Sequence, residues 1–217
     1  MAGCADWAPL CPFTKDRRRL AEADAVVFHN FQLDQKDHLP ASRLPHQRFV
    51  WLMLESPGYY PRPNPVFQSN FFNWTMTYRL DSDILLPYSQ SAFRLPHNGS
   101  LTDAEWAAKD NLLFWAVSNC EAPSLRLSFV QEILNHANVT VVGACAQRLK
   151  HSNQIRCDNC SAAWKQRSFF YLALENSICR DYVTEKFWSS LSTASVPIVF
   201  RRRSTQAPFR LAKALRI

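Results

Sequence analysis

FYLALENSICRDYVTEKFW, residues Phe170–Trp188, is the most informative stretch of the chain. Its first five residues, 170–174, are all apolar, which suits a buried strand. A polar break at 175–177 follows, and apolar side chains then recur at helical spacing between Val183 and Leu191. A strand, a polar turn and a helix in this order predict one unit of an open α/β sheet.

The polar turn of this unit is a candidate binding site. In open α/β sheets, ligands bind at the carboxyl ends of the strands, where helix N-termini point free N–H groups outward. Lys186, in the first turn of the expected helix, adds a positive charge, so the junction suits a phosphate group. The residues alone leave a second interpretation open, namely a helix cap with an intrahelical ion pair.

Short apolar runs predict further strands on both sides of this stretch. These runs are Asp24–Phe28, Phe49–Leu54, Trp74–Leu80, Asn111–Ser118, Val139–Gly143 and Val196–Phe200. Ser124–Ala137 has a helical apolar face, with Ser124 as the expected N-cap, and its place between two strands predicts a parallel sheet. Gln32–Gln47, Gly58–Pro65 and Pro87–Gly99 are expected to connect these elements, the last as a linker between domains.

The amino-acid composition limits which classes of protein this chain can belong to. The 217 residues are 47% hydrophobic and 20% charged, which is ordinary for a soluble globular chain. The formal net charge of +7 is compatible with nucleic acid, an anionic membrane surface or an anionic substrate. Basic residues are scattered apart from 17–19 and 201–203, and no zinc-finger, RRM or KH signature accompanies them. We therefore expect a phosphate-rich small substrate and no nucleic acid.

Cysteines and glycosylation sequons favour an oxidising compartment. The chain has seven cysteines, and N-glycosylation candidates occur at Asn73, Asn98, Asn138 and Asn159. No window reaches ~18 uninterrupted apolar residues, and Met1–Leu10 does not read as a signal peptide. The sequence thus shows no signal or membrane anchor of its own.

Two short motifs raise the question of metal or redox chemistry. Cys157 and Cys160 form a CxxC pair, but no second ligand pair at zinc spacing is evident. Thioredoxin-like chemistry would need the pair at the start of a helix, whereas we expect it in a polar loop. Asp81 and Asp83 form a DxD pair, which is open to a metal site or a turn.

The chain resembles the α1,3-fucosyltransferases, glycosyltransferase family 10, which use GDP-fucose. Residues 170–188 are close to the family's donor-binding run FYLxFENSxxxDYxTEKxW. The likeness covers roughly residues 11–200, and its other blocks follow in the family's order. These are ADAVVFH (Ala23–His29), WLMLESP (Trp51–Pro57), FNWTMTYRLDSDILLPY (Phe72–Tyr88), WAVSN (Trp115–Asn119), CDNC (Cys157–Cys160) and SVPIVF (Ser195–Phe200).

The resemblance implies an α/β, GT-B-like fold of two Rossmann-type domains. We expect residues 1–100 to form the acceptor-side domain, incomplete at its N-terminus. Residues 101–200 are expected to form the GDP-fucose-binding domain, whose C-terminal part is missing because the likeness stops after Phe200. Residues 201–217 then form a divergent basic tail. An inactive carbohydrate- or partner-binding fragment of such an enzyme is the alternative function.

The resemblance also assigns the reacting and diphosphate-binding groups. Glu55, directly after an expected strand, matches the glutamate proposed as the general base, although position alone would make it a solvated carboxylate. Arg126, seven residues past Asn119, matches the family's diphosphate-binding arginine. Taken alone, an arginine here is more often a surface residue whose stem packs down.

Four residues of the opening stretch match donor-contacting positions of the family. Lys186 would neutralise the diphosphate together with the arginine, and Asn176 and Tyr182 would contact phosphate. Glu185 would contact fucose or ribose hydroxyls. Two alternatives stay open: Tyr182 simply packs, and Glu185 compensates the helix dipole.

The implied reaction is an inverting transfer of fucose from GDP-fucose to a GlcNAc hydroxyl in α1,3 linkage. The acceptor is expected to be an N-acetyllactosamine-type or other GlcNAc-containing glycan of a glycoprotein or glycolipid. No cofactor is required, a divalent metal at most stimulates, and the DxD pair then reads as a turn. Members sit in the Golgi behind a membrane anchor that this chain lacks, and a pair placed like Cys157–Cys160 forms a disulfide.

Overall fold

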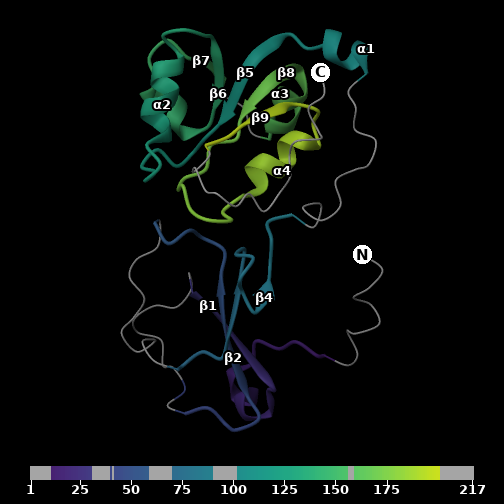
Figure 1. Cartoon of the computed structure of the whole chain (residues 1–217), viewed down its shortest axis with the longest axis vertical. Helices are drawn as coiled ribbons and strands as arrows, with labels where there is room; N and C mark the ends of the chain where they lie inside the picture. The colour runs from purple at the N-terminus through teal and green to yellow at the C-terminus, as the bar shows by residue number, and fades with distance from the viewer. Residues whose placement is uncertain are drawn as a thin grey trace. The chain divides into compact units, whose positions relative to one another are not determined.

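The computed structural model describes residues 11–30, 40, 42–58, 70–89, 102–155 and 159–200. The chain divides into two compact units (Figure 1). One consists of Met1–Leu52 and Asn64–Thr75, and the other of Met53–Pro63 and Met76–Ile217. No helix in the described ranges has both the length and the apolar character needed to span a membrane.

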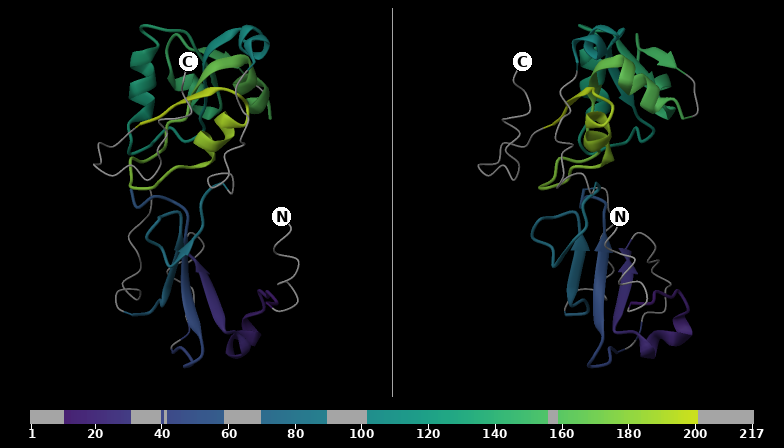
Figure 2. Two further views of the ribbon diagram at one scale, coloured as in Figure 1. Left: turned by 45° about the vertical axis from the view of Figure 1, so that its right-hand side comes forward. Right: turned by 90° about the vertical axis from the view of Figure 1, so that its right-hand side faces the viewer.

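The first half of the described chain forms a four-stranded sheet in the order β1-β2-β3-β4 (Figure 2, right). A 3-10 helix, η1, precedes it, and β1 runs parallel to β2 with Ala25 opposite Arg48. The rings of Phe28 and Phe49 meet edge to face at 5.0 Å within the first unit. The elements are η1 (Arg17–Glu22), β1 (Ala25–His29), β2 (Arg48–Met53), β3 (Trp74–Thr77) and β4 (Ile84–Leu85).

The second half forms a five-stranded sheet in the order β7-β6-β5-β8-β9, and each neighbouring pair is parallel. The strands are β5 (Asn111–Ala116), β6 (Val139–Val142), β7 (Asn153–Ile155), β8 (Ser168–Leu172) and β9 (Val196–Ile198). The helices are α1 (Asp103–Ala107), α2 (Arg126–Ile133), the 3-10 helix η5 (Ala144–Arg148), α3 (Ser161–Arg167) and α4 (Glu185–Leu191). These parallel sheets confirm the expected α/β class.

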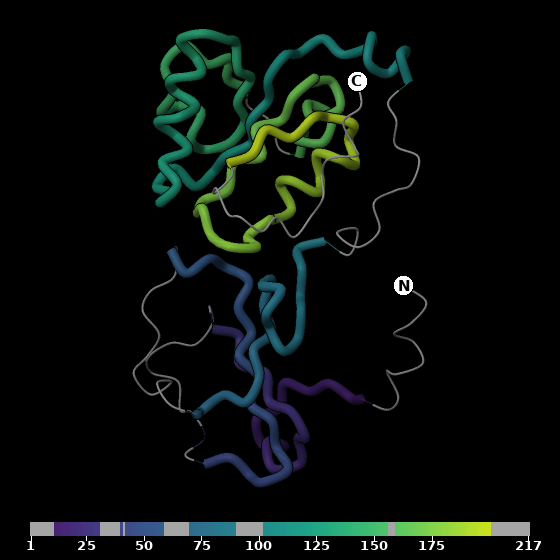
Figure 3. Tube along the Cα trace, in the orientation of Figure 1, coloured from purple at the N-terminus to yellow at the C-terminus, as the bar shows by residue number. Residues whose placement is uncertain are grey.

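The strand order places a switch point between β5 and β8. From β5 the chain proceeds outward through β6 and β7, and then returns to add β8 and β9 on the other side. Such a reversal opens a crevice at the carboxyl ends of the two central strands, where α/β proteins bind ligands. Figure 3 follows the segment that leaves β8, residues 173–184, before it enters α4.

Helices cover both faces of this sheet. On one face, Val130 of α2 packs into a cluster with Trp115, Val141 and Leu172, all of which are at most 1% exposed. On the other face, Phe114 and Tyr171 pack against Trp164 of α3. Alternating strand residues therefore point to opposite helices, as buried parallel strands require.

Several expected boundaries are wrong in detail. The helix expected at Ser124–Ala137 is α2, Arg126–Ile133, and its N-cap residue is Leu125, in the left-handed region at φ 54°. Ser124 instead donates its hydroxyl to the Glu175 carbonyl at 2.7 Å, which accounts for the loss of its capping role. The helix expected from the spacing between Val183 and Leu191 starts two residues later, at Glu185 after the cap Thr184.

The expectation for the CxxC pair is also corrected in part. Cys160 is the N-cap residue of α3, so this cysteine does open a helix that follows a strand. It is disulfide-bonded, while its expected partner Cys157 lies outside the described residues. Most of the connecting segments expected at 32–47, 58–65 and 87–99 likewise lie outside them, as does Asn98.

Candidate functional site

The turn after β8 is the centre of the candidate site. The main-chain carbonyls of Leu174, Glu175 and Asn176 each accept a hydrogen bond from the start of the α2 region. Leu174 accepts from Arg126 at 2.8 Å, while Glu175 and Asn176 accept from the Ser124 hydroxyl and N–H at 2.7 and 3.0 Å. The start of the α2 region and the turn after β8 are therefore hydrogen-bonded to each other through three consecutive carbonyls.

Arg126 is fixed by the main chain. Besides Leu174, its guanidinium donates through Nη2 to the Asn119 carbonyl at 3.0 Å. The residue is 4% exposed, and its Nε is buried with no partner among the described residues. Burial lowers the pKa of Arg126, and the nearby carboxylate of Glu175 offsets part of that shift.

Glu175 is a buried carboxylate at the same turn. It accepts the Thr184 N–H at 2.8 Å and the Thr184 hydroxyl at 2.7 Å, and its Oε2 lies 3.7 Å from Lys186 Nζ. Burial raises the pKa of Glu175, although the charge of Lys186 and the bonds from Thr184 work against that rise. A buried carboxylate thus contacts Lys186 and also interacts electrostatically with Arg126.

Lys186 is held in the first turn of α4. Its Nζ donates to the Thr184 hydroxyl oxygen at 3.0 Å and to Glu185 Oε1 at 2.9 Å. The Lys186 side chain is largely buried, whereas that of Glu185 is mostly exposed. Lys186 therefore presents its charge between two carboxylates, one buried and one at the surface.

Glu55 lies in the segment 53–63, which belongs to the same unit as residues 76–217. Its Oε2 accepts the Tyr182 hydroxyl at 3.1 Å and lies 3.4 Å from Asn176 Nδ2. Tyr88 donates its hydroxyl to the Leu54 carbonyl at 2.5 Å, next to Glu55 in the chain. The carboxylate that sequence reasoning singled out thus faces the turn after β8.

Unpartnered polar atoms gather around this turn. Within the described ranges, four buried polar atoms here have no hydrogen-bond partner: Ser56 Oγ, Arg126 Nε, Asn176 Oδ1 and Ser177 Oγ. Buried polar groups are nearly always hydrogen-bonded, so such a group is a mark of a ligand or an ordered solvent site. The turn has the hydrogen-bonding capacity that a polar ligand requires.

All six predicted site residues lie in one unit. The structure joins Glu55, Asn176 and Tyr182 by direct contact, and Arg126 and Lys186 flank Glu175. Glu185 joins the group through its ion pair with Lys186.

Two residues at this turn were missed by sequence reasoning: Thr184 and Tyr88. Glu175 lies in the polar break 175–177 that was expected to hold a ligand, although no role of its own was assigned to it. Thr184 had a signal, because a threonine directly before an apolar helical segment is a preferred N-cap, whereas only the fold brings Tyr88 close to Tyr182.

The DxD pair bears on the question of metal binding. The described residues contain no group of three or more His, Cys, Asp or Glu side chains arranged to hold a metal ion. Asp81, half of the DxD pair, accepts from Arg79 at 2.7 Å and lies 3.7 Å from Arg180. Arginine charge thus already balances this carboxylate, which lowers its pKa.

A disulfide that sequence reasoning did not pair joins Cys120 to Cys145. Three of the sequon asparagines, Asn73, Asn138 and Asn159, are exposed. The Asn73 side chain is engaged, since its Oδ1 accepts the Phe49 N–H at 2.8 Å. Glycosylation at these positions stays a prediction.

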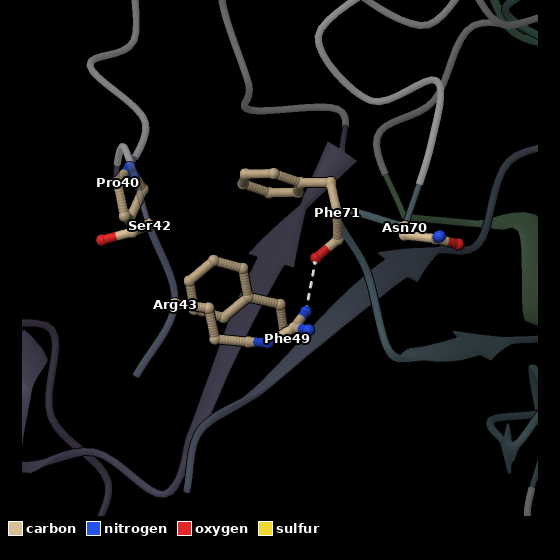
Figure 4. Close-up of a pocket in the computed structure, with 6 residues that line it drawn as sticks. All are labelled: Pro40, Ser42, Arg43, Phe49, Asn70 and Phe71. Carbon is tan, nitrogen blue, oxygen red and sulfur yellow. Dashed lines mark hydrogen bonds between the residues drawn. The ribbon is translucent and has the colours of Figure 1, made fainter. Parts of the chain in front are cut away.

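One pocket of about 260 Å³ lies elsewhere, in the first unit (Figure 4). It is lined by Pro40, Ser42, Arg43, Phe49, Asn70 and Phe71. Arg43 donates to the Phe71 carbonyl at 3.0 Å across it. Because Phe49 is near the amino end of β2 and no predicted site residue lines the pocket, we do not assign it to the site.

Two family models match the chain. The model described as "Fucosyltransferase, N-terminal" matches residues 1–89, and the model described as "Glycosyltransferase family 10 (fucosyltransferase) C-term" matches residues 106–213. The second match continues past Phe200, where the sequence motifs end.

Curated relatives are identical to this chain at about a third of the aligned positions. An α-(1,3)-fucosyltransferase 7 of Homo sapiens is 35% identical over 192 residues, which cover 87% of this chain and 52% of the relative. A 3-galactosyl-N-acetylglucosaminide 4-α-L-fucosyltransferase of Pongo pygmaeus is 34% identical over 208 residues, covering 92% and 53%. The chain therefore spans about half the length of these relatives. A crystal structure of an α1,3-fucosyltransferase with GDP-fucose aligns with a TM-score of 0.46 at 17% identity, covering 71% of this chain and 53% of that one.

Proposed function

Because this chain belongs to the fucosyltransferase family, glycosyltransferase family 10, we propose that it transfers fucose from GDP-fucose to a hydroxyl group of an acceptor glycan. The observation that carries the proposal is the meeting of two cations and a separate carboxylate at residues 174–176. Sugar transfer from a nucleotide needs positive charge for the leaving diphosphate and a base for the attacking hydroxyl.

Arg126 and Lys186 are the proposed diphosphate ligands. The two Nη groups of Arg126 are bound to main-chain carbonyls, so the guanidinium is held in place before any donor arrives. Its Nε remains as a free donor. Lys186 Nζ can exchange its contact with exposed Glu185 for a phosphate oxygen, and Glu185 is then free for a sugar hydroxyl. Asn176 and Tyr182 would lie between diphosphate and base.

Glu55 is the proposed general base. It would take the proton of the acceptor hydroxyl, whose oxygen attacks the anomeric carbon of fucose on the face opposite the diphosphate. The bond from that carbon to the phosphate oxygen breaks, and GDP leaves with the electron pair. A single displacement of this kind inverts the configuration, through an oxocarbenium-like transition state of the type known for glycoside hydrolysis. The arginine and lysine charges balance the leaving group, so no metal is needed.

The finer parts of the proposal concern acceptor and compartment. We propose a GlcNAc hydroxyl of an N-acetyllactosamine-type glycan in α1,3 linkage, which is the linkage in the names of several relatives. We propose the Golgi lumen as the compartment. The Cys120–Cys145 bridge and the disulfide-bonded Cys160 support it, because such bonds persist in oxidising surroundings.

Transfer of radiolabelled fucose from GDP-fucose to N-acetyllactosamine tests the proposal. Glu55→Gln is expected to lower the rate by ~10²–10⁴-fold, the usual contribution of a general base, while GDP binding persists. Glu132→Gln is the matched control, because that glutamate is exposed on α2 and contacts only its helix neighbours Asn135 and His136 among the described residues. Equal rates for the Glu55→Gln variant and the unaltered protein would remove Glu55 from the mechanism.

Calorimetric titration with GDP tests the donor site separately. Lys186→Ala is expected to weaken GDP binding, whereas Lys150→Ala, at an exposed position beyond η5, is not. If the unaltered protein binds GDP but transfers no fucose, the alternative function as a binding fragment replaces the enzymatic one. If it binds no GDP, the donor-site assignment is wrong.

A further inference from the structure

The Cys120–Cys145 bridge lies next in sequence to a residue whose main chain accepts a hydrogen bond from Arg126. Cys120 directly follows Asn119, whose carbonyl accepts the Arg126 Nη2–H at 3.0 Å. Cys145 is 0% exposed and belongs to the core cluster that contains Val117 and Val141. The bridge therefore connects the main chain that holds Arg126 to the rigid centre of the sheet.

The segment that carries Asn119 has little other support. Residues 117–125 form neither helix nor strand. Their start is fixed to β6 and to η5, because the Val117 N–H donates to the Val142 carbonyl at 2.8 Å and the Cys145 N–H donates to the Val117 carbonyl at 3.3 Å. Their end is fixed by the bonds of Ser124 to the turn after β8.

Between these two ends, besides the bond from Arg126 itself, an ion pair is a second attachment of residues 118–122 to η5. Glu121 pairs with Arg148 of η5, and the side chains are 83% and 55% exposed. Exposed ion pairs contribute little to stability. The covalent bond from Cys120 to the buried Cys145 is thus the strong attachment of this stretch.

We propose that the Cys120–Cys145 bridge is a positioning element for the diphosphate site. It fixes the Asn119 carbonyl, which in turn fixes the Arg126 guanidinium toward the bound nucleotide. This inference rests on the proposed function of Arg126 as a diphosphate ligand. It implies that opening the bridge weakens nucleoside diphosphate binding and raises the KM for the donor more than it lowers kcat.

A double-mutant cycle with GDP as the probe tests the proposal. Cys120→Ala with Cys145→Val is expected to raise the Kd for GDP roughly tenfold, since small misplacements of a binding group cost one to two orders of magnitude. In an Arg126→Ala background the same pair of substitutions is expected to change the Kd less than about twofold, because the bridge acts through that arginine. If the two cysteine substitutions raise the Kd by the same factor in the Arg126→Ala background as in the unaltered protein, the proposal is overturned.

Two controls separate positioning from general destabilisation. Glu121→Gln removes the exposed ion pair that joins the same two segments, and it is expected to leave the Kd unchanged. Val141→Ala destabilises the core cluster that Cys145 packs into but leaves the bridge and the bond from Arg126 to the Asn119 carbonyl chemically unaltered. If Val141→Ala, at an equal fall in Tm, weakens GDP binding as much as loss of the bridge, the bridge has no specific role.

A second measurement covers the case in which the bridge-free variant fails to fold. The unaltered protein is titrated with a reducing agent, while thiol labelling reports the opened bridge and circular dichroism reports the fold. A rise in the Kd for GDP that tracks labelling in the folded protein supports the proposal, and an unchanged Kd overturns it. Absence of GDP binding by the unaltered protein would overturn the donor site as well, which distinguishes the two failures.

Discussion

The Tyr182 hydroxyl donates to Glu55 Oε2 at 3.1 Å. Tyr182 is 5% exposed, and its ring meets the ring of Tyr78 edge to face at 4.9 Å. Burial raises the pKa of Tyr182 well above its ordinary value, so the phenol keeps its proton and stays a donor at neutral pH. The residue therefore orients the carboxylate that we propose as the base.

Tyr182→Phe is expected to lower kcat for fucose transfer by roughly ten- to hundredfold. A hydrogen bond to a charged group is worth about 1.5–3 kcal/mol, and each 1.4 kcal/mol corresponds to about tenfold in rate. The Kd for GDP, measured by calorimetry, is expected to change far less, because the substitution keeps the buried ring.

Tyr78→Phe is the matched control for this prediction. Tyr78 packs against Tyr182 through its ring, and burial raises its pKa to about 12, so it too is a neutral phenol. Loss of its hydroxyl is expected to leave kcat within about twofold, since the structure shows no bond from it to Glu55. A larger effect of Tyr182→Phe on GDP binding than on kcat would instead make Tyr182 a phosphate ligand.

The general layout could be predicted from local patterns. The apolar run before Glu175 and the helical spacing after Val183 indicated a strand and a helix, and both exist with boundaries shifted by two or three residues. The strand–helix–strand order around residues 111–143 predicted parallel pairing, which is confirmed for β5 and β6. Such patterns are strong because side-chain periodicity directly reflects burial.

Contacts between distant segments could not be predicted in the same way. Ser124 has the residue type and position of an N-cap, yet its hydroxyl donates across 51 positions to Glu175. Only the folded sheet brings these two segments together, so tertiary contact overrides local propensity. The same holds for the Cys120–Cys145 pairing, because seven cysteines allow many connectivities and spacing alone does not select one.

Gly143→Ala is expected to lower the free energy of unfolding by at least about 2 kcal/mol, which is the usual scale of the cost when a residue is held in a strained backbone conformation. Gly143 has φ +107°, which L residues rarely adopt, and an added Cβ would lie 2.3 Å from the Val117 carbonyl oxygen. Urea denaturation measures the loss. Gly58→Ala serves as the comparison, since the nearest atom to its added Cβ would be the Ser177 hydroxyl oxygen at 3.2 Å. Equal losses for the two variants would contradict the account.

Thr184→Val is expected to lower the free energy of unfolding by about 2–4 kcal/mol. This is the sum of a lost N-cap and a lost hydrogen bond to a buried carboxylate. The hydroxyl accepts the Lys186 N–H at 3.4 Å and donates to Glu175 at 2.7 Å. Thr102→Val, at the capping box of α1, removes a cap and a bond to the exposed carboxylate of Glu105, and it should lower the free energy of unfolding by about 1 kcal/mol. Thermal or urea denaturation of both variants measures the two losses of stability. An equal loss for both would mean that the buried contact with Glu175 contributes nothing beyond the cap.

Glu175→Gln is expected to change how stability depends on pH. Burial holds the pKa of Glu175 above its ordinary value of 4.5, and the charge of Lys186 does not fully compensate. The folded state therefore binds this proton more tightly than the unfolded chain does. Its contribution to stability is fully present below the ordinary pKa and is lost as the pH rises through the folded pKa.

The glutamine variant keeps an oxygen that can accept from Thr184 but carries no titrating group. The free energy of unfolding of the variant and of the unaltered protein is measured by urea denaturation from about pH 4 upward. At the acidic end the difference between the two proteins should be constant. As the pH rises, the unaltered protein should lose stability relative to Glu175→Gln. Glu185, the exposed partner of Lys186, whose charge also raises the pKa of Glu175, is present in both proteins. A difference that grows in the opposite direction would mean that the ion pair with Lys186 outweighs the burial of the carboxylate.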